Sequence, residues 1–298
     1  MDMLKLLHVA KRFGEKQVLR DVTFSVPEHT VFGFVGQNGA GKTTAMKLIL
    51  GFLTSDGGEI SVNGMPVHYG NTATNRFVGY LPDVPEFYAY MSPPEYLRFC
   101  GEVAGMPAKE IKARSEELLC LVGLEQEKRR IKGFSRGMKQ RLGIAQALFH
   151  RPKLLICDEP TSALDPVGRK ELLDILVSVK AQTTVLFSTH ILSDVEHICD
   201  EVAFLHDGRI VLEGSMEKVR QKRKEAAVKL EMELPDDARM LCSSFPDLKP
   251  MGRNQILLED ADLLPGILHF IADKNLKILR LERQEASLED LFLEVVGK

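Results

Sequence analysis

Short apolar runs separated by polar turns mark the first third of the chain. The runs VTFSV (22–26) and VFGFVG (31–36) predict two strands joined by the turn-like stretch PEHT. EISVNG (59–64) and FVGYLP (77–82) have the same apolar character and predict two further strands. The chain therefore begins as a strand-rich body.

The spacing of apolar residues changes directly after the second of these strands. From Gly41 onward, Ala45, Leu48, Ile49 and Phe52 follow one another at three- and four-residue intervals, which places them on one face of a helix. The pattern predicts a strand that runs straight into a glycine-rich loop and then into a helix.

A helical segment interrupts the strands in the middle of the chain. Residues from Pro93 to about His150 are rich in Glu, Lys, Leu and Ala, which favours helices. Buried strands return at LLICDEP (154–160), TVLFST (184–189) and VAFL (202–205). The Asp-Gly pair within HDGR (206–209) indicates a hairpin. This alternation is typical of an α/β body with a helical insertion.

The α/β body is expected to cover residues 1–215. The charged stretch MEKVRQKRKEAAVK (216–229) predicts a solvated linker helix, and the alternative is a basic patch that contacts lipid or a partner. Residues 230–298 predict a small C-terminal α/β domain, with strands at KLEMEL, QILLED and LKILRLER, an Asp-rich turn, and a helix around LLPGILHFIADK. SLEDLFLEVV (287–296) predicts a closing helix with a capping-box-like start.

Composition narrows the class of protein. The 298 residues are 44% hydrophobic and 27% charged, an ordinary globular balance, and the net charge of −3 gives no reason to expect nucleic acid as a partner. Five scattered cysteines without a C-x-x-C pair predict reduced thiols rather than a disulfide framework or a zinc site. The N-terminal apolar run is too short for a signal peptide, and no apolar run approaches 18 residues, so a membrane-spanning part is expected on another chain.

The stretch GQNGAGKTT (36–44) carries the first chemistry. It matches G-x-x-x-x-G-K-[ST], in which glycines let backbone N–H groups turn inward around phosphate oxygens. The helix that follows would direct its free amides and positive dipole end at the same anion. Lys42 would reach the β- and γ-phosphates and the Thr43 hydroxyl would ligate Mg²⁺, so a nucleoside triphosphate is predicted. The residues predicted to hold it are Gly36, Asn38, Gly39, Ala40, Gly41, Lys42, Thr43 and Thr44.

Two adjacent carboxylates supply the second element. The apolar run of LLICDEP predicts a buried strand, and Asp158 at its carboxyl end lies where a Mg²⁺ ligand belongs. Glu159 follows at once and can orient the attacking water as a general base. The alternative is a solvated acidic pair at a strand end. The phosphate loop that precedes the two carboxylates in the chain favours the catalytic interpretation.

A third set of motifs selects the family. FSRGMKQR (134–141) opens a helix before the Asp158 strand, SALD (162–165) follows that strand, and STH (188–190) ends the next one, while the guanine motif N-K-x-D is not found. With these motifs the sequence resembles the ATP-binding subunit of ABC transporters over residues 4 to about 215. The resemblance implies a P-loop NTPase fold with a RecA-like core, an antiparallel β subdomain and a helical subdomain at about 83–150.

The resemblance also implies roles for single residues. Ser135 and Gly137 would contact the γ-phosphate of ATP held by the opposite subunit of a head-to-tail dimer, either a homodimer or a pair with a paralogous chain. Asp165 would belong to the loop that couples the two sites, and His190 to the switch that senses the γ-phosphate. Phe13 would stack on adenine, unless it is a core residue.

The motifs depart from the usual family pattern at several positions. The signature has Arg136 and Met138 where LSGGQ is commonest, and Asp83 stands after the YLP strand where glutamine is usual. The stacking aromatic is Phe rather than Tyr. Together with SLEDLFLEVV, these features resemble the ATPase subunits of ABC-2-type exporters, which include antibiotic-resistance, lantibiotic-immunity and sodium-export systems.

Partners and location follow from the same resemblance. It implies membrane-spanning permease subunits on another chain and a peripheral position at the cytoplasmic face of the cell membrane. The permease would dock near Asp83, with Phe87, Tyr88 and Tyr90 as candidate contacts, unless these aromatics cover the core of the helical segment. The alternative function is a soluble ABC ATPase for ribosomes, DNA or cofactor assembly. The single ATPase module and the lack of a long heptad run favour transport.

Overall fold

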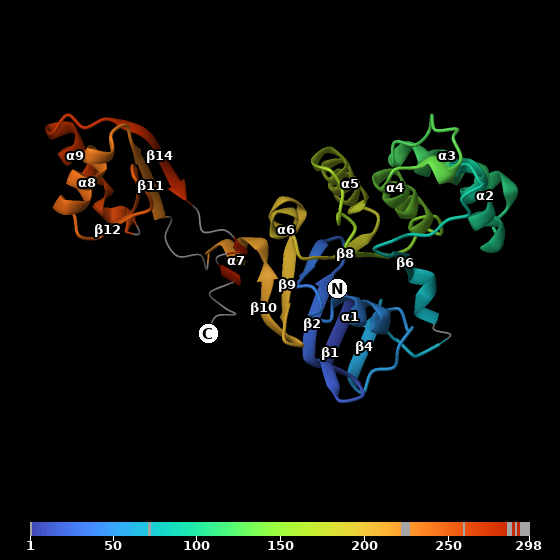
Figure 1. Ribbon diagram of the computed structural model, residues 1–298. Coiled ribbons are helices and arrows are strands. Elements are labelled where there is room, and N and C mark those ends of the chain that lie inside the picture. Colours follow the sequence, from blue (N-terminus) through green and yellow to red (C-terminus); the bar gives the residue numbers. More distant parts are fainter. Residues whose placement is uncertain are drawn as a thin grey trace. The chain divides into compact units, whose positions relative to one another are not determined.

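Two compact units make up the computed structural model (Figure 1). Unit 1 spans Met1–Met216 and unit 2 spans Glu217–Lys298. The structure describes residues 2–70, 73–221, 227–258, 260–284, 288–289 and 291–292.

A parallel sheet lies at the centre of unit 1. Its strands are β3 (Val31–Val35), β6 (Val78–Leu81), β7 (Leu154–Asp158), β8 (Thr184–Thr189) and β9 (Glu201–His206), in the spatial order β9-β3-β8-β7-β6. Every residue of β3, β7 and β8 is buried. Strands covered on both faces have continuous apolar sequences, and for this reason the apolar runs predicted them correctly.

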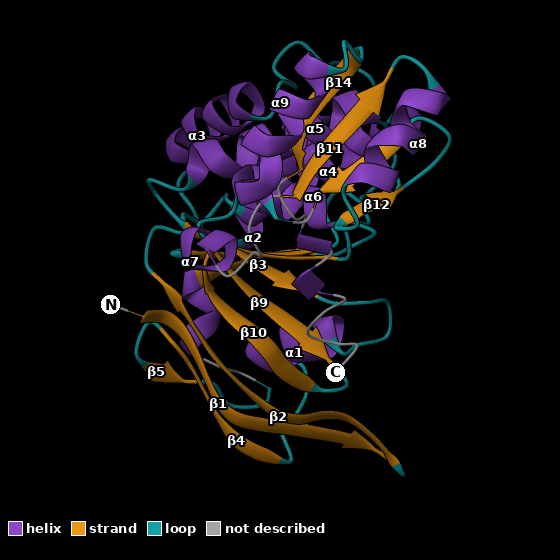
Figure 2. Cartoon of the chain, turned by 90° about the vertical axis from the view of Figure 1, so that its left-hand side faces the viewer, coloured by secondary structure: helices purple, strands orange, loops and turns teal. Residues whose placement is uncertain are grey.

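An antiparallel part extends this sheet (Figure 2). It consists of β1 (Asp2–Phe13), β2 (Lys16–Pro27), β4 (Gly57–Val62) and the short β5 (Met65–Pro66). Strand β10 (Arg209–Ser215) forms the expected hairpin with β9 and meets β2 at one residue pair, which joins the two parts. The sheet therefore runs in the order β5-β4-β1-β2-β10-β9-β3-β8-β7-β6.

Strand β1 was not predicted from the sequence. Its pairing with β2 shifts register between Leu6 and Val9, and His8 between them has a φ of 50°. A bulge of this kind breaks the two-residue alternation by which a half-buried strand is recognised.

Helix α1 (Lys42–Ile49) follows the glycine loop and is enclosed by the curled sheet. Its buried residues share one core with β1, β2, β3, β4 and β7, because the sheet bends around the helix. Phe52 was expected on this buried face but is 56% exposed. The helix ends before it: Gly51 has a φ of 70°, so the chain turns away there.

Between β6 and β7 the chain forms the expected helical segment. Its main helices are α2 (Pro93–Val103), α3 (Ala108–Leu121) and α4 (Arg136–Ala147). Helix α2 begins with a capping box, in which Ser92 and Glu95 satisfy each other's backbone donors. The remaining helices of unit 1 are η1 (Ala73–Phe77), η2 (Ile131–Gly133), α5 (Pro166–Val179) and α6 (Leu192–Ile198), and α7 (Met216–Gln221) begins at the boundary with unit 2.

Unit 2 is a small α/β unit with its own aliphatic core. Its antiparallel sheet has the order β12-β13-β11-β14. The elements are β11 (Ala227–Met232), α8 (Pro235–Ser244), β12 (Leu248–Pro250), β13 (Gln255–Leu258), η3 (Ala261–Leu263), α9 (Leu264–Asp273) and β14 (Ile278–Gln284).

The structure of this region differs from three predictions made from the sequence or describes them only in part. The expected Asp-rich turn is the first turn of α8, where acidic residues are favourable beside the helix dipole. The last residues of the expected linker helix, 227–229, belong to β11. Most of the closing helix predicted at 287–296 lies outside the described residues.

Candidate functional site

The glycine loop between β3 and α1 forms a cradle of backbone amides. Gly41 caps α1 with a φ of 110°, a conformation that favours glycine. At Gly36 an added Cβ would lie 2.6 Å from the backbone oxygen of Leu205, which is closer than any real Cβ contact. Backbone crowding therefore requires glycine at position 36, and backbone conformation favours it at position 41. The first turn of α1 leaves its amides free for an anion.

Lys42 is held inside this cradle. Its Nζ donates to the backbone oxygens of Gly36 at 2.6 Å and Gln37 at 3.2 Å. The same Nζ lies 3.0 Å from Glu159 Oε1, and the Lys42 side chain is only 5% exposed. Since Glu159 Oε1 accepts no hydrogen bond within the described residues, this contact is an ion pair. The Lys42 Nζ is thus held in a position where a phosphate oxygen could take the place of a backbone oxygen as its partner.

Glu159 links Lys42 to His190. Its Oε2 lies 2.8 Å from His190 Nδ1, on the far side of the carboxylate from Lys42. Glu159 has a φ of 48°, a left-handed conformation that costs about 1 kcal/mol for a residue with a Cβ. Two bonds hold it there, since its N–H donates to the backbone oxygen and the Oγ of Ser188. This strained backbone places the carboxylate between the lysine and the histidine.

Ser188 joins the two adjacent carboxylates and was not predicted as a site residue. Its Oγ donates to Asp158 Oδ1 at 2.6 Å while accepting the Glu159 N–H at 3.0 Å. The parallel register of β7 and β8 places Asp158 opposite Ser188. The sequence does show a hydroxyl residue, Ser188, near the end of a buried strand. Its role could be predicted only by knowing that β8 is the neighbour of β7.

A cavity of about 520 Å³ opens beside the cradle. The predicted residues that line it are Phe13, Asn38, Gly39, Gly41, Lys42, Thr43, Thr44, Asp83, Glu159 and His190. Lys16, Val18 and Ser162 also line it, and none of the three was predicted as a site residue. Asp158 lies behind the lining and is 3% exposed.

Phe13 lies at the rim of this cavity rather than in the core. It is 48% exposed, and Lys11 Nζ lies 5.5 Å from its ring centre. The alternative position in the core is therefore wrong. Its exposed ring is available to a flat ligand.

Gly36 and Ala40 belong to the loop but do not line the cavity. The Gly36 backbone oxygen is occupied by Lys42. The Ala40 Cβ would lie 3.3 Å from a Cβ at Gly36, so Ala40 packs behind the loop.

Asp83 is held by helix α4. Its Oδ1 accepts from the Arg136 guanidinium at 2.9 Å, and its backbone oxygen accepts from Gln140 Nε2 at 2.6 Å. Gln140 is fully buried, whereas the Asp83 and Arg136 side chains are 47% and 41% exposed. Two of the residues that depart from the usual family pattern, Asp83 and Arg136, are thus direct partners.

At the start of α4, Arg136 reaches Asp83 in the cavity wall, but its neighbours in the signature motif do not line the cavity. Ser135 is the N-cap, and its Oγ accepts from the Met138 N–H at 3.2 Å. Ser135 is exposed and Gly137 is half-buried, and neither lines the cavity. Asp165 is the exposed N-cap of α5 and makes no side-chain cap bond. The structure therefore does not bring these three predicted residues to the phosphate cradle of their own chain.

A buried carboxylate connects the segments that follow β7 and β8. Asp194 of α6 is 2% exposed, and it accepts from the Thr161 hydroxyl at 2.7 Å and from Arg169 Nε of α5. Arg169 also donates to Ser193. This network was not predicted, because Asp194 lies 25 residues from Arg169 and 33 residues from Thr161, and only folding brings them together. It fixes the loop that begins at Glu159.

The aromatic residues after Asp83 divide between core and surface. Phe87 packs edge-on against Tyr96 of α2, with ring centres 5.1 Å apart. Tyr88 and Tyr90 are 48% and 60% exposed, and Tyr88 also contacts Phe99. Phe87 thus covers the helical core, whereas the two tyrosines are available on the surface.

The polar groups around the cavity are mainly hydroxyls and carboxylates, which bear on the choice of metal ion. Burial, and then the negative charges of Asp158 and Asp83, raise the pKa of Tyr80 to about 12, so its phenol stays neutral near these carboxylates. No group of three or more His, Cys, Asp or Glu side chains that could hold a metal occurs among the described residues. The Thr43 hydroxyl and the Asp158 carboxylate fit Mg²⁺, which keeps waters and phosphate oxygens as its other ligands.

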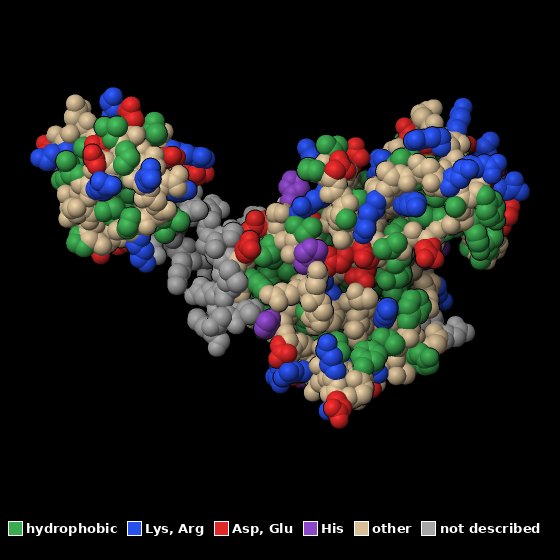
Figure 3. Space-filling view, in the orientation of Figure 1, with side chains coloured by type: hydrophobic (Ala, Val, Ile, Leu, Met, Phe, Trp, Pro, Cys, Tyr) green, Lys and Arg blue, Asp and Glu red, His purple; other side chains and the backbone are tan. Residues whose placement is uncertain are grey.

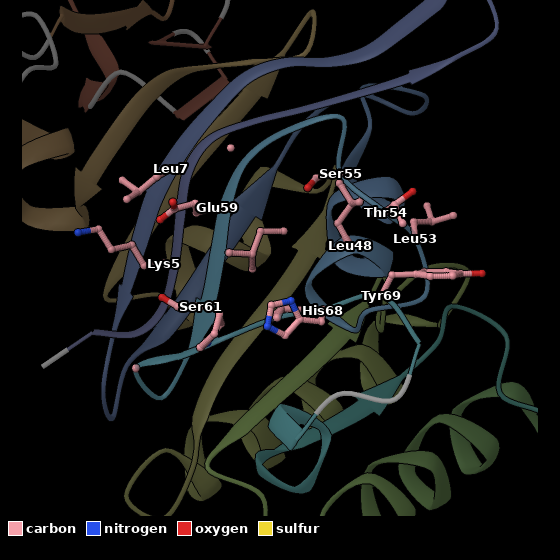
Figure 4. A pocket seen from close by; sticks show the side chains of 15 residues that line it. Lys5, Leu7, Leu48, Leu53, Thr54, Ser55, Glu59, Ser61, His68 and Tyr69 are labelled. Carbon is pink, nitrogen blue, oxygen red and sulfur yellow. The ribbon is translucent and has the colours of Figure 1, made fainter.

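Other surface features have no place in this site. A second cavity, of about 650 Å³, lies beside β1, β4 and the end of α1, and Lys5, Glu59, His68 and Tyr69 are among its lining residues (Figure 4). It contains none of the predicted site residues. On the face drawn in Figure 3, Lys and Arg side chains gather over the helical segment.

No helix in the described part of the chain has both the length and the apolar character needed to cross a membrane.

Comparison with known proteins agrees with these features. The family model for the ABC transporter domain matches residues 19–162. An uncharacterized ABC transporter ATP-binding protein, YxlF of Bacillus subtilis (strain 168), is 37% identical over 99% of both chains. The bacitracin transport ATP-binding protein BcrA of Bacillus licheniformis is 32% identical over 99% of this chain and 97% of its own.

Solved structures agree as well. The structure of an ATP-binding subunit of an ABC transporter is 33% identical, with a TM-score of 0.64 over 74% of this chain and 92% of its own. The phosphate cradle, the paired carboxylates and these relatives lead to one conclusion: the chain belongs to the ABC transporter family, as an ATP-binding, ATP-hydrolysing subunit.

Proposed function

We propose that this chain binds ATP with Mg²⁺ in the 520 Å³ cavity and, as one half of a dimer, drives membrane-spanning permease subunits of an ABC-2-type export system. The observation that carries the proposal is the row Lys42–Glu159–His190. Nζ lies 3.0 Å from one carboxylate oxygen, and His190 Nδ1 lies 2.8 Å from the other. A phosphate group and a water molecule placed in the cavity would meet all three side chains.

Each residue of the row then has a distinct task. Lys42 exchanges its contacts with loop carbonyls for phosphate oxygens and stabilises the charge of the γ-phosphate. Glu159 orients the water and takes its proton, and His190 holds the Glu159 carboxylate in place and reaches toward the γ-phosphate. Catalysis by such a site comes mainly from positioning and fixed charge.

Thr43 and Asp158 are the proposed Mg²⁺ residues. Thr43 lines the cavity, and Ser188 orients the Asp158 carboxylate from behind. The bound ion would neutralise phosphate charge during transfer. Phe13 is proposed to stack on the adenine at the rim.

The dimer is proposed because two residues of the signature motif do not line the cavity of their own chain. Ser135 and Gly137 would instead contact the γ-phosphate bound by a partner subunit. Asp165, exposed at the start of α5, would lie between the two sites. Closure of the two subunits around ATP would then supply the rigid-body motion that moves a permease.

A role in transport is supported by a relative, and a contact with a permease by exposed surface residues. A relative that matches nearly the full chain is named as a bacitracin transport protein. The exposed Tyr88 and Tyr90 beside Asp83 are proposed to contact the permease. The chain would then be a peripheral protein at the cytoplasmic face of the membrane.

The test is a pull-down with a tagged Glu159→Gln variant, which keeps the shape of the side chain and removes the base. We expect it to hydrolyse ATP at least about a hundredfold more slowly than the parent and to accumulate as an ATP-bound dimer on size exclusion. From detergent-solubilised native membranes with ATP present, it should co-purify a multi-span membrane protein.

The matched control is Glu116→Gln on the exposed face of α3, which should behave like the parent. Normal hydrolysis by Glu159→Gln would refute the assigned base. Recovery of only soluble, ribosomal or nucleic-acid partners would refute transport and leave the ATPase activity standing.

A further inference from the structure

Two residues of one chain, Asp83 and Arg136, meet at the edge of the ATP cavity. Asp83 follows β6 and lines the cavity, while Arg136 is the first residue of α4. Figure 1 shows α4 beside β6, and the two elements are in contact. The Arg136 guanidinium lies 2.9 Å from Asp83 Oδ1.

We propose that Arg136 is a positioning residue that holds and neutralises the Asp83 carboxylate of its own chain, so that the cavity can accept a triphosphate despite an acidic residue in its wall. This inference rests on the proposed ATP site. It assigns Arg136 a role within its own chain, distinct from the contact of Ser135 and Gly137 with a partner's nucleotide.

The charges in the cavity wall explain why Asp83 needs a partner. Lys42 is already paired with Glu159, and Lys16 is the other cation among the described lining residues. A triphosphate brings several negative charges into this space. A free carboxylate at Asp83 would repel it, and pairing with Arg136 removes most of that repulsion.

The backbone of Asp83 is fixed separately from its side chain. Gln140, one turn further along α4 and fully buried, donates to the Asp83 backbone oxygen at 2.6 Å. Replacing Arg136 therefore leaves the loop anchored to α4 and changes mainly the orientation and net charge of the carboxylate. This separation makes the proposal testable by substitution.

Exposure sets the size of the effect. The Asp83 and Arg136 side chains are 47% and 41% exposed, so water and salt screen their attraction. Exposed ion pairs of this kind change equilibria by at most about fivefold. The influence of the pair on ATP should also weaken as salt is added, whereas an effect of packing would persist.

The experiment is a double-mutant cycle in the full chain with Arg136→Gln, Asp83→Gln and the double variant. Affinity is measured by titration with methylanthraniloyl-ATP and the corresponding ADP analogue, at low and high salt. Arg136→Gln should bind the ATP analogue about three- to fivefold more weakly at low salt, with a smaller loss for ADP and at high salt. The double variant should return to within about twofold of the parent, and Arg136→Lys should retain most of the affinity.

The matched control is Arg98→Gln, which removes an exposed arginine from an ion pair with Glu102 on α2 and should leave affinity unchanged. The proposal is overturned if Arg136→Gln binds ATP like the parent, or if the double variant is as weak as Arg136→Gln alone. The second result would mean that Arg136 acts on phosphate directly. If the parent itself fails to bind the analogue, the proposed function fails before the cycle begins.

Discussion

The phosphate cradle and the start of α4 are both assigned to the same nucleotide chemistry, yet they are built in opposite ways. In the cradle, Lys42 and Asp158 are 5% and 3% exposed, and both have partners within the chain. At the start of α4, Ser135 and Arg136 are exposed. The cradle residues are thus buried and paired within the chain, whereas the α4 end is exposed and, in the proposed dimer, would face a second subunit.

This difference follows from where the residues lie in the fold. The cradle stands at the carboxyl ends of β3, β7 and β8, where buried parallel strands fix the loops that follow them. Charged groups enter such a place only when paired, because burial of an isolated charge is costly. The α4 end belongs to the helical segment inserted between β6 and β7, where Arg136 and Gln140 bind Asp83 in the cavity wall.

The largest expected effect comes from breaking the cradle. Lys42→Ala should lower ATP affinity and hydrolysis together by about a hundredfold or more, because it removes the cation that faces the phosphates and leaves the Glu159 carboxylate without its ion pair. Isothermal titration and a phosphate-release assay measure the two losses. Lys47→Ala, on the exposed side of the same helix, is the control and should change neither. Equal losses in both variants would place the cause in the helix rather than in the site.

The next effect tests the α4 end without disturbing its fold. Ser135→Asp and Ser135→Asn both keep an N-cap that can accept the Met138 N–H, but only the aspartate adds a negative charge. We expect Ser135→Asp to bind ATP with normal affinity as a monomer and to hydrolyse it at least about tenfold more slowly than Ser135→Asn.

Mixing the two defective chains makes the comparison decisive. A dimer of Ser135→Asp with Lys42→Ala contains one site in which both halves are intact. Activity should therefore recover to about a quarter of the parent value when the chains associate at random. Failure to recover, with dimers present, would contradict a site shared between subunits.

The smallest expected effect concerns the opposite end of the same helical segment. Burial, more than the charge of Arg114, lowers the pKa of His150 from its usual value of 6.5, although a bond to Val78 opposes the shift. The folded state thus binds this proton less tightly than the unfolded state, so stability is lost as the pH falls through and below about 6.5. The urea midpoint should fall more between about pH 7.5 and pH 5.5 for the parent than for His150→Gln. An identical fall in both would show that His150 does not titrate with folding.

Several parts of the site could be predicted because they are local in the sequence. The motif around Lys42 needs only a strand, three glycines and a helix in succession, and the chain supplies them within a few residues. The same is true of Asp158 and Glu159 at the end of an apolar strand. Backbone geometry dictates these residues, so the pattern alone identifies them.

Other features depended on neighbours that are distant in the sequence. Ser188 contacts Asp158 because of the register of β8 beside β7. Asp194 of α6 contacts Thr161 and Arg169, which belong to the segment that follows β7 in the chain. Phe52 was misplaced because a helical period does not show where the helix ends. Asp83 and Arg136 looked like two separate departures from the family pattern until the structure joined them at 2.9 Å.

The linear pattern was enough to predict the family, the glycine loop before α1 and the two adjacent carboxylates at the end of β7, because each rests on short-range backbone geometry and on residue types at fixed spacing. Folding in three dimensions settles which charges lie beside one another, that Phe13 is exposed at the cavity rim, and that Ser135 does not line the cavity of its own chain. Those outcomes depend on burial and on distances between side chains far apart in the chain, which a linear pattern does not contain.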